Sequence, residues 1–517
     1  MKKLKLVCVA IAMACAAPSF AGGLLTNTNQ HVAFNRMMSR EASIGIDGVY
    51  YNPAGVVFMG DGHHLAINWQ LAYQTRTINN DYKLFTNNVN NPITPRDFKG
   101  KAFAPVIPSF QYAYNKGKWS FQANFALTGG GGKCTFDDGL GSFEKIVSET
   151  AIAACQLAGA VDQVAGAYNV PGIFSSNQCF GTEGKYSYNS YMHGRQYYYG
   201  LSAGAAYKFS DNFSAFLGVR GVYALTNYYG YVENIQVGQM PLYKVLNPAK
   251  ESSANIELSC DQSGVGFTPI IGVDYKTGRW NFSAKYEFKT RIRLKNKSVN
   301  QIPSIGNLPD NLRNAYIANG VPEAAADAIL SNQKIQGAMV ALKTQFDSKI
   351  DGAIGEYEDG KKIAGDIPAY LALGVGYSPV DAVRVNVGFH WFDDKNATSY
   401  NNRNKELKRG TLEYNAGVEV DVNKKITLST GWQNTNYGLS DEYMDDKSFV
   451  VSSNSVAIGG VYHINKKMDL NVAYFHTFYQ HKKTSEKVQL TAEKSNNYSS
   501  DYTRNNNVFA VGLDINF

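Results

Sequence analysis

Paired amphipathic segments, joined by very short turns and separated from the next pair by a much longer loop, most constrain the fold of this chain. In the clearest segment, residues 279–294, the apolar Trp280, Phe282 and Phe288 alternate with polar residues such as Asn281. Such alternation gives one strand an apolar face and a polar face. A soluble β-sandwich also alternates, but short turns on one side and long loops on the other are typical of transmembrane β-barrels.

Fourteen segments of this kind follow one another, and the chain ends in register on the aromatic Phe517, as in the last strand of bacterial outer-membrane proteins. The predicted fold is therefore all-β: a 14-stranded antiparallel transmembrane barrel over residues 64–517. An even number leaves both termini on the short-turn side, which is the periplasm in bacterial barrels. The expected strands are 64–78, 106–114, 119–127, 196–209, 213–228, 265–275, 279–294, 368–377, 383–392, 411–420, 426–434, 454–464, 468–479 and a last one ending at residue 517.

Residues 1–21 have the pattern of a secretory signal. Three early lysines precede an apolar stretch, and Ser19-Phe20-Ala21 forms an A-x-A-like cleavage site. Cys15 raises the alternative of a lipoprotein, but Ala12 stands where a large aliphatic residue is usual. Beyond the signal no run approaches the about 20 apolar residues of a membrane-spanning helix. Export to the bacterial outer membrane is the prediction.

The formal charge of +7 falls to +4 without the three signal lysines, which is too weak and too dispersed to indicate a nucleic-acid partner. Four cysteines follow the signal: Cys134, Cys155, Cys179 and Cys260. An even number in an exported protein predicts two disulfides, of which at least one links neighbouring loops, with three pairings open. Metal binding is the weaker alternative, because none of the four has C-x-x-C spacing. No cofactor is expected.

Residues 22–63 precede the first strand and do not have a strand pattern. They end in Asn52-Pro53-Ala54-Gly55, which is by itself an ordinary turn sequence. An N-terminal segment with Asp-Gly and then Asn-Pro-Ala, directly before a 14-stranded barrel, resembles the FadL/TodX family of outer-membrane transporters for long-chain fatty acids and hydrocarbons. The resemblance implies that this segment is a hatch folded inside the lumen.

The same resemblance implies a route for a hydrophobic substrate: capture by extracellular loops, passage past the hatch, and lateral exit by a kinked third strand. Here that strand ends at Gly129, Gly130, Gly131 and Gly132, where the free backbone permits a kink. A flexible loop start is the alternative. The implied partners are a hydrophobic small molecule, outer-membrane lipid and the barrel-assembly machinery, and the implied state is a monomer.

Two outer loops, residues 129–195 and 296–365, are long enough to fold. Apolar residues at near-helical spacing predict a helix over residues 142–165 and another over 322–350, the second started by Pro322. An amphipathic helix above the mouth of the barrel can present an apolar groove to a lipid, although such faces more often pack on their neighbours.

A carboxylate substrate would be helped by an inward cation. Alternation places the side chains of five arginines inward, and Arg220 and Arg384 are the candidates, against the alternative that lumen arginines brace the plug. The five are Arg76, Arg220, Arg291, Arg293 and Arg384.

Other function classes have less support in the sequence. His390, His476 and His481 lie toward outer strand ends with serines nearby, but neither G-x-S-x-G nor H-E-x-x-H occurs, so no enzyme is predicted. A general diffusion porin would lack a forty-residue segment able to fill the lumen. A surface adhesin rests on loop length alone.

Overall fold

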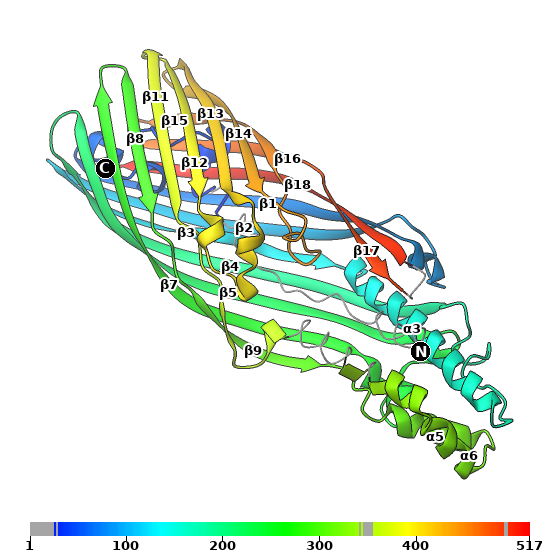
Figure 1. The fold of residues 1–517 in the computed structure, drawn as a ribbon. Helices are drawn as coiled ribbons and strands as arrows, with labels where there is room; N and C mark the ends of the chain where they lie inside the picture. Colours follow the sequence, from blue (N-terminus) through cyan, green and yellow to red (C-terminus); the bar gives the residue numbers. More distant parts are fainter. Residues whose placement is uncertain (1–24, 27–28, 341–342, 345–354, 491–494) are drawn as a thin grey trace.

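The computed structural model describes residues 25–26, 29–340, 343–344, 355–490 and 495–517; the predicted signal peptide lies outside these residues. Within them, one antiparallel sheet closes on itself, because β1 pairs with β18 from His64↔Asn516 to Tyr82↔Tyr498 (Figure 1). The barrel wall has fourteen strands, as predicted. They are β1 (Gly62–Tyr82), β2 (Arg96–Lys116), β3 (Trp119–Phe136), β4 (Tyr186–Lys208), β5 (Phe213–Val237), β7 (Ile256–Thr277), β8 (Trp280–Glu287), β11 (Tyr370–Val380), β12 (Val383–Phe392), β13 (Arg409–Asn423), β14 (Ile426–Gly438), β15 (Ser453–Asn465), β16 (Met468–Tyr479) and β18 (Ser495–Asn516).

Shorter elements complete the described chain. The short strands are β6 (Met240–Pro241), β9 (Arg293–Gln301), β10 (Lys362–Ala364) and β17 (Lys482–Gln489). The helical elements are α1 (Val32–Met37), α2 (Gly48–Tyr51), η1 (Gly55–Met59), η2 (Lys83–Asn87), α3 (Gly141–Gly166), α4 (Tyr243–Leu246), η3 (Glu251–Ala254), α5 (Leu308–Ala318), α6 (Glu323–Leu330), η4 (Gly355–Tyr357), η5 (Asp394–Asn396) and η6 (Tyr400–Glu406). None of the described helices is both long and apolar enough to cross a bilayer.

The wall strands alternate between an apolar outer face and a polar inner face. On β7, Phe267 is 67% exposed on the outside, whereas Gln262, Thr268 and Asp274 are buried on the inside. Exposed apolar side chains recur on the other wall strands, among them Ile67, Phe121, Leu201, Leu217, Leu428 and Ile458. An exterior of this kind is suited to lipid and not to water.

The two ends of the barrel differ. The short turns and the C-terminus lie at one end, and α3, α5 and α6 lie at the other (Figure 1). Toward the helical end most strands run beyond their predicted limits, because the alternation of an apolar outer side and a polar inner side ends there: the start of β18 is polar, and the end of β5 buries the apolar Val232 and Ile235. The long loops are shorter than predicted for the same reason, since β3 continues to Phe136 and β4 begins at Tyr186.

The predicted strand 279–294 is broken, and the break inverts the direction of two arginines. The register of β8 against β7 is Ile270↔Glu287, while β9 resumes at Ser263↔Lys295, so residues 288–294 contain one residue more than the stretch of β7 opposite them. An extra residue exchanges the two faces of a strand. Arg291 and Arg293 are therefore exposed, and the prediction that they point inward is wrong.

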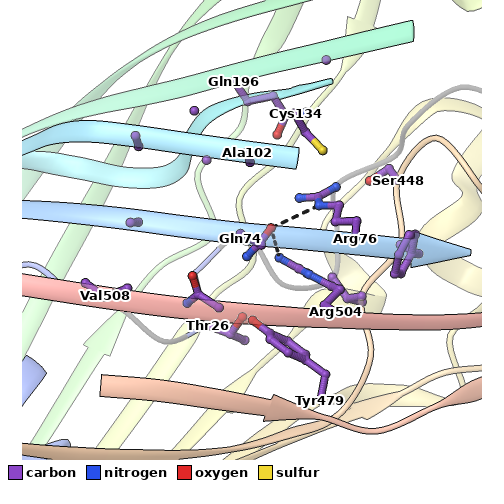
Figure 2. Close-up of a pocket in the computed structure, with 18 of the residues that line it drawn as sticks. Thr26, Gln74, Arg76, Ala102, Cys134, Gln196, Ser448, Tyr479, Arg504 and Val508 are labelled. Carbon is purple, nitrogen blue, oxygen red and sulfur yellow. Dashed lines mark hydrogen bonds between the residues drawn. The ribbon is translucent and has the colours of Figure 1, made fainter. Parts of the chain in front are cut away.

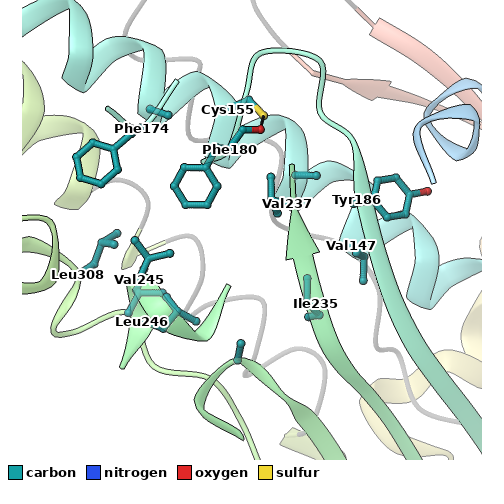
Figure 3. Packing of buried hydrophobic residues seen from close by; sticks show 14 of the residues in the cluster. Val147, Cys155, Phe174, Phe180, Tyr186, Ile235, Val237, Val245, Leu246 and Leu308 are labelled. Carbon is teal, nitrogen blue, oxygen red and sulfur yellow. Dashed lines mark hydrogen bonds between the residues drawn. The ribbon is translucent and has the colours of Figure 1, made fainter. Parts of the chain in front are cut away.

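The helix of the first long loop is confirmed, since α3 runs from Gly141 to Gly166. The second predicted helix begins after Pro322 as expected, but α6 ends at Leu330, and a separate helical stretch covers residues 333–340. Part of that prediction, including residues 345–350, lies outside the described residues. Figure 3 shows the apolar cluster in which α3 packs against β5 and the loop that follows it.

The four cysteines of the described chain are free, so the two predicted disulfides are absent. Cys134 on β3 and Cys260 on β7 lie in one row of the sheet, with Gly194 of β4 and Tyr228 of β5 between them. Three interstrand spacings of about 4.8 Å separate them, far more than the about 7 Å that a disulfide tolerates between Cα atoms. Cys155 donates instead to the carbonyl oxygen of Phe180 at 3.4 Å.

Candidate functional site

The segment from Asn29 to Gly60 lies inside the barrel. Its helix α1 contacts β1 and β13 to β16 together with β18, while α2 and η1 contact β2, β3, β4 and β7, so it touches the wall on opposite sides. The wall donates hydrogen bonds to its backbone carbonyl groups, a pattern that satisfies buried polar groups without regular structure. The donor–acceptor pairs are Gln111 to Gln30 (2.7 Å), Asn281 to Ala42 (2.9 Å), Lys285 to Tyr50 (2.6 Å), Gln122 to Pro53 (2.7 Å), Ser214 to Ala54 (2.7 Å) and Asn115 to Val56 (2.8 Å).

Buried ion pairs add to these bonds. Arg36 pairs with Glu419 of β13, and Arg40 lies 2.7 Å from Asp47 and 3.3 Å from Glu419. These groups lie in the lumen, away from bulk water, where each charge requires its partner. Ion pairs as well as hydrogen bonds therefore attach the segment to the barrel wall.

The Asn52-Pro53-Ala54-Gly55 sequence forms the turn that the composition predicts. The Oδ1 atom of Asn52 accepts the backbone N–H of Gly55 at 3.2 Å, and its Nδ2 donates to Oδ2 of Asp274 on β7 at 2.6 Å. The side chain therefore closes the turn and fixes it to the wall. Asp274 is not among the residues predicted from the sequence. The feature that could have indicated it is an acidic residue at an inward position of a strand.

The third wall strand is irregular where the four glycines occur. Against β4 its register shifts between Leu127 and Gly129 and again between Gly130 and Gly132. Against β2, no pairing is present between Ser109↔Ala126 and Ala102↔Cys134. We call this unpaired section, residues 103–108 of β2 and 127–133 of β3, the window.

Proline and glycine explain why the window forms. Pro105 and Pro108 lie in this part of β2 and have no N–H to donate across the gap. On the other side Gly130 has a φ of 78°, a conformation that glycine adopts readily. The glycines of β3 indicate only one side of the window in the sequence. The two prolines of β2 are the sequence signal for the other side.

A cavity of about 240 Å³ reaches the window from inside the barrel. Ala102, Ala104 and Ile107 of β2 and Gly130 and Gly132 of β3 line it on that side. Figure 2 shows the opposite side, where Arg76 of β1 and Arg504 of β18 both point toward Gln74. Most of the remaining lining is apolar or neutral: Thr26, Asn29, Ala72, Cys134, Phe136, Met192, Gly194, Gln196, Tyr228, Tyr437, Ser448, Phe449, Val450, Phe475, Tyr479, Asn506 and Val508.

The two arginines proposed from sequence as ligands for a carboxylate do not line this cavity. Arg220 is buried against Glu287, and Arg384 forms two bonds with Asp421, at 2.7 and 2.6 Å. Their charges are already matched by wall carboxylates. Of the five arginines, only Arg76 lies at the cavity, and its neighbour Arg504 was missed because the last strand was recognised only from its apolar end.

The three histidines considered for catalysis have other partners. His390 lies between Glu41 and Glu413, at 2.7 and 2.9 Å. The Nδ1 atom of His476 is 2.8 Å from Asn507, and that of His481 is 3.1 Å from Asp501. Among the described residues, no serine hydroxyl is hydrogen-bonded to any of the three.

The helix α3 is fixed over the barrel end by buried charges. Glu144 pairs with Arg96 of β2 and accepts the Tyr186 and Tyr188 hydroxyls of β4, each at 2.9 Å. Lys145 lies 3.1 Å from Glu486 of β17. The helix is thus attached to strands that are far apart in the sequence.

No protein-family model matches the chain, and a search of curated proteins finds no relative. Solved structures do match. A FadL homologue from Pseudomonas aeruginosa superposes with a TM-score of 0.60 at 14% identity, covering 96% of this chain and 100% of that one. The deltaS2S3 mutant of the monoaromatic hydrocarbon channel TodX gives 0.52 at 14% identity, covering 94% and 98%. The resemblance seen in the sequence is confirmed at the level of the fold.

Proposed function

We propose that this chain, whose barrel has the FadL-type fold, carries hydrophobic molecules across the bacterial outer membrane. The observation that carries the proposal is the cavity that reaches the window between β2 and β3. A molecule held there has the apolar side chains of Ala102, Ala104 and Ile107 on one side of it, and beside it a section of wall without hydrogen bonds between β2 and β3. At such a section β2 and β3 can separate at a lower cost in free energy than at a paired section, because no hydrogen bonds between the two strands must break.

In the proposed route, the helical loops around α3, α5 and α6 face the outside and capture the substrate from the medium. The segment from Asn29 to Gly60 acts as the hatch that fills the lumen below the cavity. The substrate then leaves through the window into the membrane instead of continuing along the barrel axis. Both termini are periplasmic in this arrangement, and the barrel functions as a monomer placed by the barrel-assembly machinery.

The filled lumen favours this route over an open porin, since the wall makes hydrogen bonds to the segment at many points along it. The proposed activity is transport without chemistry. The adhesin alternative is supported by nothing beyond the long loops, which the capture step also requires.

The test is uptake of a labelled hydrophobic probe, dodecanoate or toluene, by cells that produce the protein. Ala104→Phe adds a ring to the cavity side of β2, and Ala123→Phe makes the same change outside the cavity. The proposal requires that Ala104→Phe lower uptake at least several-fold while Ala123→Phe leaves it unchanged. Equal uptake by cells with and without the protein, or a steady ion current through the purified protein in planar bilayers, would contradict it.

A further inference from the structure

Five basic side chains form a stripe on the outside of the barrel, along β9 and its neighbour β10. Between residues 291 and 297 alternate side chains are exposed, while Ile292, Leu294 and Asn296 between them are buried. The extra residue after Glu287 is what turns the exposed set outward instead of into the lumen. We call the five side chains the basic stripe: Arg291, Arg293, Lys295, Lys297 and, on β10, Lys362.

The basic stripe begins where the apolar outer face of the wall ends. A Cβ atom added at Gly266 of β7 would lie 2.9 Å from the carbonyl oxygen of Arg291, so Arg291 is level with the exposed Phe267. Toward the helical end, Lys295 pairs with Ser263 of β7. The apolar outer band of a barrel contacts the acyl chains of the bilayer, so cations at its border lie at the height of the lipid head groups.

Most of the basic stripe has no acidic partner. Arg293 is the exception, since its Nη1 atom lies 2.8 Å from Oδ1 of Asp366. Asp261 stands opposite Lys297 in the register, but its carboxylate accepts a hydrogen bond from Asn227 at 2.8 Å. Within the described ranges, four members of the stripe form no ion pair: Arg291, Lys295, Lys297 and Lys362.

Two of these unpaired cations face each other. Lys295 and Lys362 are directly opposed in the β9–β10 register. Like charges in opposed positions of an antiparallel pair repel each other, and screening by salt is weaker where part of the surroundings is lipid. An anion between the two ammonium groups replaces this repulsion by attraction. Phosphate suits the position, because its oxygens accept hydrogen bonds from ammonium and guanidinium groups together.

We propose that the basic stripe binds the phosphate group of a membrane lipid in the leaflet at the helical end of the barrel. Arg291, Lys295 and Lys362 hold the phosphate, and the exposed Phe267 and Phe288 contact the acyl chains. A lipid uses both the basic stripe and the apolar face beside it, whereas a free phosphate ion uses only the first. This lipid belongs to the membrane around the barrel and is not cargo, so the inference goes beyond the proposed function.

The test compares two lipids with the same acyl chains: dioleoyl phosphatidic acid, which has a phosphate group, and dioleoylglycerol, which has none. Binding to the full chain in a non-ionic detergent is titrated by native mass spectrometry. The stripe variant is Arg291→Gln/Lys295→Gln/Lys362→Gln. Heat-dependent gel mobility verifies that each variant forms the barrel.

The matched control is Lys83→Gln/Lys334→Gln/Lys487→Gln. It removes the same formal charge from exposed positions of η2, of the chain after α6 and of β17. A second control adds excess inorganic phosphate, compared with sodium chloride of the same ionic strength. The first control separates the basic stripe from net charge, and the second separates a lipid site from an ion site.

The wild type is expected to bind phosphatidic acid at least about tenfold more tightly than dioleoylglycerol, since each basic side chain beside a charged lipid surface contributes about fivefold. The stripe variant should lose this preference and the control variant should keep it, and inorganic phosphate should displace no more lipid than the chloride does.

Equal binding of the two lipids by the wild type, or a preference that survives in the stripe variant, overturns the inference. An equal loss in the control variant also overturns it, because net charge then explains the binding. Displacement by inorganic phosphate would show that the stripe holds a free anion only. Uptake of the hydrophobic probe by the stripe variant should equal that of the wild type, so each of these failures leaves the proposed function standing.

Discussion

The Oε1 atom of Glu41 lies 2.7 Å from Nε2 of His390, and this buried contact ties the N-terminal segment to the barrel wall. The other ring nitrogen of His390 faces Glu413 of β13 at 2.9 Å. A single histidine thus joins the lumen segment to two wall strands. In the proposed route, this contact holds the hatch in place while substrate enters and leaves the cavity.

Replacing Glu41 with alanine should loosen the lumen segment. Breaking a buried ion pair by removing one partner typically costs about 3–5 kcal/mol, since the remaining charge stays buried. Amide hydrogen exchange in residues 29–60 should become faster, while exchange in β12 and β13 stays slow. Glu183→Ala, at an exposed carboxylate, is the control. Unchanged exchange in the Glu41 variant would show that this contact does not hold the segment.

Two glycines of the inner wall allow the end of α1 to approach closely. A Cβ atom added at Gly431 or Gly417 would overlap the carbonyl oxygen of Met37, which belongs to the backbone and cannot rotate away. Gly431→Ala should therefore displace the segment, at a cost of about 1–3 kcal/mol, and raise ion conductance in planar bilayers.

Gly272→Ala is the matched control for Gly431→Ala. A Cβ there meets Ala284 and Pro53 at 3.6 and 3.7 Å, which is ordinary contact. The control should conduct as little as the wild type. A Gly431 variant with wild-type conductance and thermal stability would mean that the lumen segment adapts to the added methyl group.

The loop that carries η4 should be less stable at alkaline pH. Burial raises the pKa of Glu356 from 4.5 to about 8. Between these two pKa values the unfolded loop releases a proton that the folded loop keeps. The stability of the folded loop therefore falls as the pH rises through this range. The loss is at most about 1.4 kcal/mol for each pH unit. The protection of residues 355–357 against hydrogen exchange, taken relative to the intrinsic exchange rate at each pH, should fall from pH 5 to pH 8.

Glu356→Gln should remove this pH dependence, since an amide of similar shape does not titrate. The variant should resemble the wild type near pH 5 and exchange more slowly than the wild type near pH 8. The same loss of protection in both proteins would place the titrating group elsewhere.

Cys134 and Cys260 should be thiols in the purified protein. They are separated by β4 and β5 in one row of the sheet, which is too far for a disulfide. Alkylation in denaturant without reductant, followed by mass spectrometry, should modify both residues. Modification of either one only after reduction would contradict the separation of the two strands.

The sequence predicted the membrane half of the barrel well because lipid imposes a strict alternation there. Outside the lipid that constraint ends. The polar start of β18, which holds Arg504, has no apolar face to reveal it, and before Val265 the apolar residues Ile256, Leu258 and Cys260 of β7 lie on the inner side of the strand together with Gln262. Pairing with an already formed neighbour, which is a tertiary effect, extends these strands.

The errors have equally local causes. Alternation assumes an unbroken register, so a single extra residue after Glu287 was enough to misplace Arg291 and Arg293. The even number of cysteines says nothing about distance, and the three interstrand spacings between Cys134 and Cys260 exclude one of the pairings. The glycines of β3 predict only one edge of the window, and the other edge depends on Pro105 and Pro108 of β2.

The most direct test of the account is a reversible lock across the window. A Cβ atom at Gly132 would lie 3.6 Å from that of Ala104, a separation suited to a disulfide. We would measure probe uptake by Ala104→Cys/Gly132→Cys in a Cys134→Ser background, with Tyr112→Cys/Ala123→Cys as the control, a pair that already lies in regular register. Uptake should fall to background on oxidation, return with reductant, and stay constant in the control. Full uptake through the oxidised window would show that the substrate does not leave between β2 and β3.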